Sequence, residues 1–298
     1  MVHYTNCPVC SKPNLAFFLR SKDFLVSGKE FDLCQCSDCN FIFTQDHPDE
    51  KDIGKFYQSE NYISHNDTKR GLFNTLYHFV RKLMLFKKKN LVKRSTGLQS
   101  GSLLDIGSGT GYFASTMKNA GWEVSGVEVN EAARNYSIEK FEIDIKSPDE
   151  IKKMPNESFD CITLWHVLEH LENPNNYLDE ISRLLKPGGT CLIALPNYQS
   201  FDAEYYKQFW AGYDVPRHLW HFNSNTFKKL IDNHGFKFIS KALLPFDAFY
   251  ISILSEKNKG ASFIMMRGMI TGLKSFFISI FKVERSSSIV YIIRKYSD

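Results

Sequence analysis

The chain has 298 residues, of which 43% are hydrophobic and 14% aromatic, enough for one full α/β domain with a smaller appendage. This composition excludes a disordered chain, and the opening MVHYTNCPVC lacks the basic and apolar regions of a secretory signal, so we expect a cytoplasmic protein. The net charge is only +4, but nine Lys or Arg and no acidic residue lie between Lys69 and Arg94. The uneven placement of charge is therefore more informative than its total.

Five of the seven cysteines lie near the amino terminus, and four of them form two C-x2-C pairs separated by 25 residues: Cys7, Cys10, Cys36 and Cys39. Paired motifs of this kind are the usual way in which four thiolates bind one Zn²⁺ ion. We therefore predict a zinc ribbon over residues 1–45, with the four thiolates holding a structural Zn²⁺. The role of Cys34, two residues before the second pair, stays open.

Residues 46–99 are predicted to form a linker with a short helix around Ile53–Tyr57, followed by a basic amphipathic helix. Apolar residues recur there at helical spacing: Leu72, Phe73, Leu76, Tyr77, Val80, Leu83 and Met84. The basic face could bind nucleic acid, an anionic membrane or a phosphorylated substrate, and a solvated helix face is the plain alternative.

Strands alternate with helices from Ser102 onward, a pattern that predicts a parallel sheet with right-handed crossovers. One helix should begin near Asn173 and another should run over residues 224–234. The predicted strands are SLLDI, EVSGVEV, EIDIK, FDCITLW, TCLIAL, FKFISKALL and SSIVYIIRK, and we expect the last of them at the edge of the sheet.

A glycine-dense turn, LLDIGSGTGYF, follows the first of these strands. Its G-x-G-x-G spacing differs from the dinucleotide fingerprint, which needs glycine where Tyr112 stands, and no Walker Gly-Lys-Ser/Thr follows. A tight turn with no ligand is the alternative. Asp105 ends the strand before the turn, and Glu128 ends the next strand, where an acid can accept both ribose hydroxyls. Acids around such a turn favour a cationic nucleoside, S-adenosylmethionine (SAM).

The motifs DIGSGTGYF, VSGVEVN, SFDCITLWHVLEHL and RLLKPGGTCLIALPN resemble, in order, those of class I SAM-dependent methyltransferases over residues 100–240. The resemblance implies an α/β, Rossmann-like seven-stranded sheet whose last strand is antiparallel, with Asp105, Gly107 and Gly111 at the methionine moiety and Glu128 at the ribose. The full set of predicted cofactor residues is Asp105, Gly107, Gly109, Gly111, Tyr112, Glu128, Val129, Asp144, Trp165 and His166. The cysteine module, with FYQSENY at 56–62, resembles the zinc ribbons that precede the methyltransferase domain of sugar C-methyltransferases.

The segment HVLEH, residues 166–170, allows three interpretations. It matches the H-x-x-E-H pattern of a class of zinc peptidases. It also resembles the E-x-x-E-H motif of certain small-RNA and quinone O-methyltransferases that use a divalent metal, although His166 stands where they have the first Glu. Because it follows a parallel strand at the rim of the cofactor pocket, we expect His166 to line that pocket, with metal binding and ordinary packing as alternatives.

The aromatic insertion at 197–223 is predicted to form the acceptor pocket, and a packed lid is the alternative. A hydroxyl or amine acceptor gains from a base with a pKa near neutrality. We expect His218 to be this base, with His221 as second choice, and Arg217 to hold an acidic group of the substrate.

The helix predicted at 261–282 carries apolar residues on one side: Phe263, Met266, Ile270, Leu273, Phe277 and Phe281. Polar residues lie on another side: Arg267, Thr271, Lys274 and Lys282. Charges within the run argue against a spanning helix, and the pattern favours a membrane interface, with packing between the last strands as the alternative.

These patterns predict a SAM-dependent methyltransferase in the domain 100–298, acting on a small-molecule acceptor that is lipid-linked, a glycan or quinone-like, peripheral at the inner face of the membrane. An RNA methyltransferase that uses the ribbon and basic helix is the alternative within enzymes. A catalytically inactive zinc-ribbon binding protein and a zinc peptidase are the others.

Overall fold

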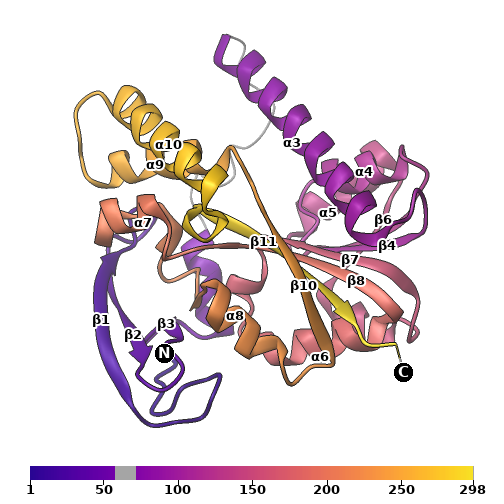
Figure 1. Ribbon diagram of the computed structural model, residues 1–298, viewed down its shortest axis with the longest axis horizontal. Helices are drawn as coiled ribbons and strands as arrows, with labels where there is room; N and C mark the ends of the chain where they lie inside the picture. Colours follow the sequence, from indigo (N-terminus) through magenta and orange to yellow (C-terminus); the bar gives the residue numbers. More distant parts are fainter. Residues whose placement is uncertain (58–71, 298) are drawn as a thin grey trace.

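The computed structural model describes residues 1–57 and 72–297, which form two sheets. The smaller sheet has the order β1-β2-β3-β9 and the larger one the order β10-β11-β8-β7-β4-β5-β6. Figure 1 shows the small sheet beside α7 and α8, with the large sheet on the other side of them.

The small sheet contains the cysteine module and one strand of the aromatic insertion. Its antiparallel strands are β1 (Leu15–Lys22), β2 (Glu30–Cys36), β3 (Ile42–Thr44) and β9 (Trp220–His221). The apolar run at 41–43 is fully buried and packs against Trp220 and Phe222 of the insertion. A module too small to bury its own core therefore gains one by pairing with the insertion.

The linker contains α1 (Glu50–Ile53) and η1 (Gly54–Tyr57), and the basic helix is α3 (Leu72–Thr96). Residues 58–62 of the predicted ribbon linker and the side chains at 72, 73, 76 and 77 lie outside the described part of the structure. The later turns of α3 pack against α4, β7 and β8, and Val92 is fully buried there. The basic helix and the sheet thus form one packed unit.

The large sheet confirms the predicted α/β architecture. Its parallel strands are β4 (Ser102–Ile106), β5 (Glu123–Val127), β6 (Asp144–Lys146), β7 (Phe159–Trp165) and β8 (Leu185–Pro196). They alternate with α4 (Tyr112–Lys118), α5 (Glu131–Phe141), η2 (Pro148–Lys153), η3 (Leu168–His170) and α6 (Pro174–Leu184). The side chains of Asn130 and Asn173 cap the amino termini of α5 and α6. The start of α6 at Asn173 agrees with the start predicted from the sequence.

The last strand is not at the edge, so that expectation was wrong. β11 (Ser288–Lys295) lies between β8 and β10 (Phe236–Leu243) and is antiparallel to both. The residues of β11 are buried over most of its length, whereas only Phe236 of β10 is buried and β10 forms this edge of the sheet. A continuous apolar run such as SSIVYII is typical of a strand covered on both sides.

The carboxyl-terminal region adds helices around the insertion. They are α7 (Phe201–Tyr206), η4 (Lys207–Phe209), η5 (Ala211–Tyr213), α8 (Ser224–Ile231), α9 (Asp247–Asn258), α10 (Ile264–Phe281) and η6 (Val283–Arg285). The sequence analysis did not identify α9, which packs along α10 as an antiparallel hairpin (Figure 1).

Candidate cofactor and acceptor site

The glycine turn after β4 lies at the carboxyl end of the parallel strands, and each of its three glycines has a positive φ. A Cβ on Gly107 would lie 2.3 Å from Val167 Cγ2, and one on Gly111 would lie 1.9 Å from Ser137 Oγ. A Cβ on Gly109 would meet nothing within 4 Å. The outer glycines are therefore required by packing, whereas Gly109 faces open space in which a ligand can approach the backbone.

Glu128, directly after β5, is fastened to this turn. Its carboxylate accepts the backbone N–H of Gly109 at 2.8 Å and that of Asn130 at 2.8 Å. A carboxylate has about four acceptor positions, so two remain for the hydroxyls of a ribose. The carboxylate is thus oriented before a ligand arrives.

Asp105 is 2% exposed at the end of β4, and the Thr163 hydroxyl donates to its carboxylate at 2.6 Å. Burial raises the pKa of Asp105 to about 7, because the charged form loses its hydration. An ammonium group beside it would restore the charged form. Thr163 positions this carboxylate, a contact that no motif in the sequence indicates.

Trp165 ends β7 and packs edge to face against Phe113 with ring centroids 5.2 Å apart. The Lys88 ammonium of α3 lies 4.3 Å from the Trp165 ring centroid. Burial lowers the pKa of Lys88, although the nearby charges of Asp247 and Asp105 oppose this. In the sequence Lys88 is one of several cations on the basic helix; the docking of α3 against the sheet brings its ammonium beside Trp165.

The other predicted cofactor residues divide into two groups. Val129 is 78% exposed beside Glu128, and the Tyr112 ring lies under the guanidinium of Arg81 at 4.0 Å, so both are at the rim of the turn. Asp144, by contrast, pairs in register with Ser125 at the start of β6 and forms an exposed ion pair with Lys146. Since ligands bind beyond the carboxyl ends of the strands, the structure does not bring Asp144 to the site.

His166, after β7, adopts a left-handed backbone with φ of 60°. Its Nε2 lies 3.0 Å from Asp247 Oδ2 on α9, and its Nδ1 lies 3.5 Å from Glu169 Oε1. Burial alone would lower the pKa of His166, but the two carboxylates raise it to about 9, so the ring is cationic at neutral pH. His166 is therefore a positive group held between two carboxylates directly after β7.

The acceptor side contains a cluster of three further residues from HVLEH and the insertion: Glu169, His170 and His218. Their ligand atoms lie within 4.8 Å of one another, and the two imidazole centroids are 4.5 Å apart. Glu169 is fully buried, and neither of its carboxylate oxygens has a hydrogen-bond partner among the described residues. Sequence reasoning selected His218 and HVLEH separately, but only the fold brings them together.

Arg217 and His221 do not have the roles expected of them. Arg217 is 1% exposed, and its guanidinium pairs with Asp23 at 3.0 Å and Asp214 at 2.6 Å and donates to the Phe56 carbonyl at 2.8 Å. Arg217 thus links the ribbon to the insertion, and its guanidinium is occupied by these contacts rather than available to an acidic group of a substrate. His221 is 4% exposed in β9, where its Nε2 lies 3.1 Å from Thr44 Oγ1 of the ribbon and burial lowers its pKa.

The four ribbon cysteines converge as predicted. The Sγ atoms of Cys7 and Cys39 are 3.5 Å apart, those of Cys10 and Cys36 are 3.6 Å apart, and all four lie within 4.8 Å. Four thiolates at about 2.3 Å from one tetrahedral Zn²⁺ would have comparable separations, so the set fits that ion. Cys34 is outside this cluster, and none of the seven cysteines, all of them described, forms a disulfide.

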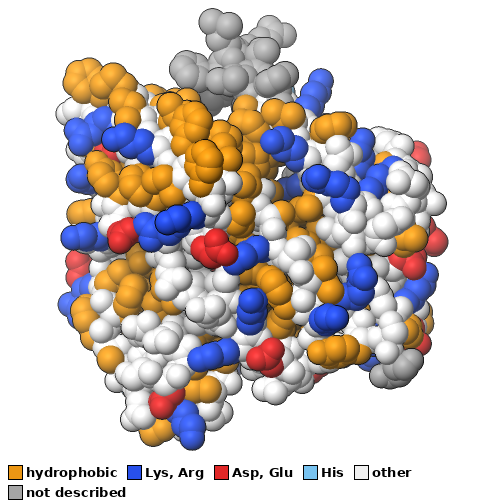
Figure 2. Space-filling view, viewed as in Figure 1, with side chains coloured by type: hydrophobic (Ala, Val, Ile, Leu, Met, Phe, Trp, Pro, Cys, Tyr) orange, Lys and Arg blue, Asp and Glu red, His pale blue; other side chains and the backbone are white. Residues whose placement is uncertain are grey.

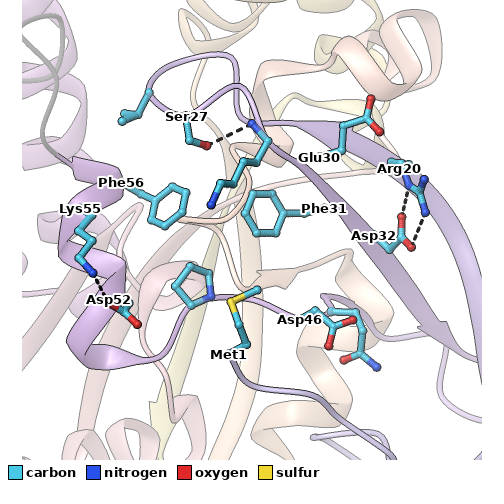
Figure 3. Close-up of a pocket in the computed structure, with 14 residues that line it drawn as sticks. Met1, Arg20, Ser27, Glu30, Phe31, Asp32, Asp46, Asp52, Lys55 and Phe56 are labelled. Carbon is cyan, nitrogen blue, oxygen red and sulfur yellow. Dashed lines mark hydrogen bonds and ion pairs between the residues drawn. The ribbon is translucent and has the colours of Figure 1, made fainter.

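A cavity of about 600 Å³ lies on the ribbon between β1, β2 and α1 (Figure 3). Two ion pairs lie in its wall, Arg20 with Asp32 and Lys55 with Asp52. All of its lining residues belong to the ribbon and linker and none to the glycine turn, so the cofactor is assigned to the turn and not to this cavity.

The sheet order, the bare turn and the two carboxylates together define a class I SAM-dependent methyltransferase domain. A family model described as a methyltransferase domain matches residues 76–241, more than half of the chain, and the chain belongs to this family.

Individual relatives agree with this assignment. A ubiquinone biosynthesis O-methyltransferase from Alkalilimnicola ehrlichii is 30% identical over 109 residues, which cover 34% of this chain and 44% of that protein. A protein named probable S-adenosylmethionine-dependent methyltransferase from Mycolicibacterium smegmatis is 26% identical over 172 residues, covering 56% of this chain and 62% of its own length. The alignments thus span about half of these relatives.

Among solved structures, phosphoethanolamine N-methyltransferase 2 of Haemonchus contortus with SAM superposes with a TM-score of 0.52 at 18% identity. The superposition covers 86% of this chain and 62% of that one. At this identity the likeness shows the fold alone.

Proposed function

We propose that the protein transfers a methyl group from SAM to the hydroxyl of a small, membrane-associated acceptor. The observation that most directly supports this proposal is the arrangement of Gly109, Glu128 and Asp105. Gly109 leaves its backbone accessible, Glu128 is already oriented to accept ribose hydroxyls, and the buried Asp105 could pair with an ammonium group. When bound, SAM supplies a methyl group on a positively charged sulfur. The residues around it position the acceptor and receive its proton.

Methyl transfer forms a bond from an acceptor lone pair to the methyl carbon as the sulfur–methyl bond breaks, with its electron pair remaining on sulfur. A neutral hydroxyl must also lose its proton. The groups that lie near the acceptor side and could receive it are Glu169 and His218. The Nδ1–H of His218 donates to the Gly212 carbonyl at 2.9 Å, which leaves Nε2 as the nitrogen with a lone pair.

The similarity to ubiquinone biosynthesis O-methyltransferases supports a hydroxyl on a quinone-like acceptor as the methylated group. Such acceptors carry apolar tails and reside in membranes, so a membrane-facing surface on this chain would be consistent with them.

The α9–α10 hairpin offers such a surface. The side of α10 that packs on α9 consists of small residues, and a Cβ on Gly268 or Gly272 would lie 2.6 or 2.7 Å from the backbone of α9. Thr271, expected on the polar side, is buried with them. The large apolar residues point outward instead, each at least 46% exposed: Phe263, Met265, Met266, Met269, Ile270, Leu273, Phe277, Ile280 and Phe281. These outward residues are therefore not the core packing considered as an alternative.

Cations surround this apolar side: Lys257, Lys259, Arg267, Lys274 and Lys282 are all exposed. Figure 2 shows hydrophobic side chains gathered with Lys and Arg over this part of the molecule. α10 is the one described helix long and apolar enough to cross a membrane by length and composition, but its internal charges and its packing on α9 favour lying at the surface. We propose an anionic lipid surface, at the cytoplasmic face, as its partner.

We propose further that the ribbon holds a structural Zn²⁺ through Cys7, Cys10, Cys36 and Cys39. Four thiolates fill a tetrahedral shell and leave no position for water. The ion would stabilise the small sheet that carries β9, and through β9 the position of the insertion.

Calorimetry with SAM, followed by label transfer from methyl-labelled SAM to hydroxyl-bearing quinol precursors, tests the activity. Glu128→Gln should weaken SAM binding at least tenfold, whereas the exposed control Asp144→Asn should bind as the wild type does. Absence of SAM binding by the folded wild type would refute the proposal.

A further inference from the structure

A hollow of about 140 Å³ lies where α7 meets the α9–α10 hairpin. Residues of three helices line it, and those from α10 recur at helical spacing: Phe201 and Tyr205 of α7, Glu256 of α9, and Arg267, Ile270, Thr271 and Lys274 of α10. Glu256 follows Asp247, the α9 residue that contacts His166, by nine positions, which is about 14 Å of helix. The hollow is therefore separate from the cofactor and acceptor site.

Arg267 is held in this hollow by a buried carboxylate. Glu256 is 1% exposed, its Oε1 accepts from the Tyr206 hydroxyl at 3.0 Å, and its Oε2 lies 3.4 Å from Nε of Arg267. A guanidinium has further N–H donors on its two terminal nitrogens, and no described residue accepts a hydrogen bond from them. Because the Arg267 side chain is 46% exposed, these donors are available to a ligand.

Lys274 is the second cation of the hollow. It is exposed, one helical turn and a half beyond Arg267 on α10, and it forms no ion pair with any described residue. Two cations and one carboxylate leave one net positive charge, and the Lys259 ammonium, 5.8 Å from the Tyr205 ring centroid, adds another at the edge. Guanidinium and ammonium groups are the usual protein ligands of phosphate, so the hollow suits a phosphate group.

The hollow adjoins the outward apolar side of α10. Ile270 lines the hollow and also belongs to that side, where it is 50% exposed beside Met266 and Leu273. On the α7 wall the ring of Tyr205 stacks on Phe201 with centroids 6.3 Å apart and is 50% exposed. Tyrosine is typical of the boundary between lipid tails and water. A phosphate in the hollow would therefore place an attached acyl chain on the apolar side.

We infer that the hollow binds the phosphate of one anionic phospholipid, through the free N–H groups of Arg267 and the ammonium of Lys274, with the acyl chains lying on the outward apolar side of α10. The inference rests on the lipid partner proposed above and makes it specific. A diffuse basic surface attracts any anionic membrane, and each of its cations contributes about equally. A built site makes Lys274 more important than the other cations of the hairpin and binds one lipid even where no membrane is present.

The experiment is a calorimetric titration of the full chain with short-chain phosphatidylglycerol, kept below the concentration at which it forms micelles. Monomeric lipid carries no membrane surface potential, so it reports on the hollow alone. We expect one lipid per chain, with an affinity reduced at least tenfold in Lys274→Gln. The matched control is Lys282→Gln, which removes an exposed cation at the end of α10 outside the hollow and should bind like the wild type. Glycerol phosphate, which has no acyl chains, should compete poorly.

The thermal midpoint and SAM affinity of each variant should equal those of the wild type, since Lys274 and Lys282 have no ion-pair partner among the described residues. Arg267→Lys, which keeps a cation beside Glu256, serves as a second variant and should bind the lipid more weakly. No stoichiometric binding by a folded wild type, or equal affinity in Lys274→Gln, would overturn the inference even if anionic liposomes still bind. Competition by glycerol phosphate as strong as by the lipid would overturn it in favour of a soluble phosphorylated ligand. Loss of liposome binding or of SAM binding by the wild type would instead contradict the proposed function.

Discussion

The imidazole Nε2 of His166, at the rim of the cofactor pocket, lies 3.0 Å from Oδ2 of Asp247, the first residue of α9. Since α9 packs along α10, this pair joins the cofactor rim to the hairpin that carries the exposed apolar side. The α9–α10 hairpin and the carboxyl end of β7 are thus directly connected.

Replacement of Asp247 by Asn should weaken SAM binding and destabilise the fold by about 1–2 kcal/mol, because cationic His166 loses its charged partner. Calorimetry and thermal unfolding would measure both effects. The matched control is Asp179→Asn, which removes an exposed carboxylate from His234 far from the turn and should leave SAM affinity unchanged. Unaltered SAM affinity in Asp247→Asn would show that the pair is not coupled to the cofactor.

Replacement of Asp105 by Asn should have opposite effects on stability and binding. The folded pKa of Asp105 is raised to about 7, so between about pH 4 and pH 7 the unfolded chain loses a proton that the folded chain keeps. Ionisation of the Asp105 carboxyl therefore lowers the free energy of unfolding of the wild type as the pH rises through this window, and above the window this destabilisation is complete. Asn does not ionise, so it avoids the destabilisation, and its side-chain oxygen can still accept a hydrogen bond from Thr163.

The thermal midpoint of Asp105→Asn relative to wild type should consequently be higher at pH 8 than at pH 4. Its SAM affinity at pH 8 should be about tenfold lower, because the ammonium loses a charged partner. A difference in midpoint that does not change with pH would mean that Asp105 titrates normally.

Replacement of Gly109 by Ala tests whether the open space above the turn belongs to the cofactor. The added Cβ meets no protein atom, so the fold should lose only about 1–2 kcal/mol from the left-handed backbone at φ of 53°. SAM affinity should fall more than tenfold, because the alanine side chain would fill the space in which SAM is proposed to contact the backbone of the turn. The matched control is Gly121→Ala, because Gly121 also has a positive φ and open surroundings but is remote from the turn. This variant should have a slightly lower thermal midpoint and bind SAM like the wild type.

If the ribbon holds Zn²⁺ as proposed, substitution of Cys36 by Ser should abolish zinc binding and lower the thermal midpoint, because the ion would stabilise the small sheet. Cys34→Ser should retain one Zn²⁺ per chain, since this thiol is outside the cluster. Elemental analysis and thermal unfolding measure both outcomes. Loss of Zn²⁺ from Cys34→Ser would move that residue into the ligand set.

Flotation with anionic liposomes tests the exposed side of α10. The wild type should bind and be partly released by high salt, because the surrounding cations contribute alongside the apolar residues. Ile270→Glu with Phe277→Glu should abolish binding, whereas Phe17→Glu, an equally exposed aromatic position on β1, should not. Equal binding by neutral and anionic liposomes would remove the role of the cations. Binding of RNA in place of liposomes would favour the alternative partner.

Sequence patterns predicted those sites whose residues are close together in the chain or directly follow a strand. The glycine turn, Asp105 and Glu128 could be identified because parallel strands bring their carboxyl ends to one edge of a sheet. The cluster of four cysteines could be identified because two C-x2-C pairs are the usual spacing of a tetrahedral thiolate site. These residues lie where the sequence indicated.

The roles of the insertion could not be assigned in the same way. Arg217, His218 and His221 lie within five positions of one another, yet their surroundings differ. Arg217 pairs with Asp23 and Asp214, His218 lies beside Glu169 and His170, and His221 lies in β9 against Thr44. Thr163, Lys88 and Asp247 join the site from three separate elements, and no spacing in the chain relates them.

The sequence by itself determined the family, the cofactor turn and the thiolate set, because backbone conformation and short-range ligand spacing are properties of local segments. Only the tertiary structure decided that the ribbon and the insertion share a sheet, that the large apolar residues of α10 face outward and that Glu169 meets His218. Those outcomes depend on which faces pack together, and the free energy of burying a face belongs to the pair of elements rather than to either one alone.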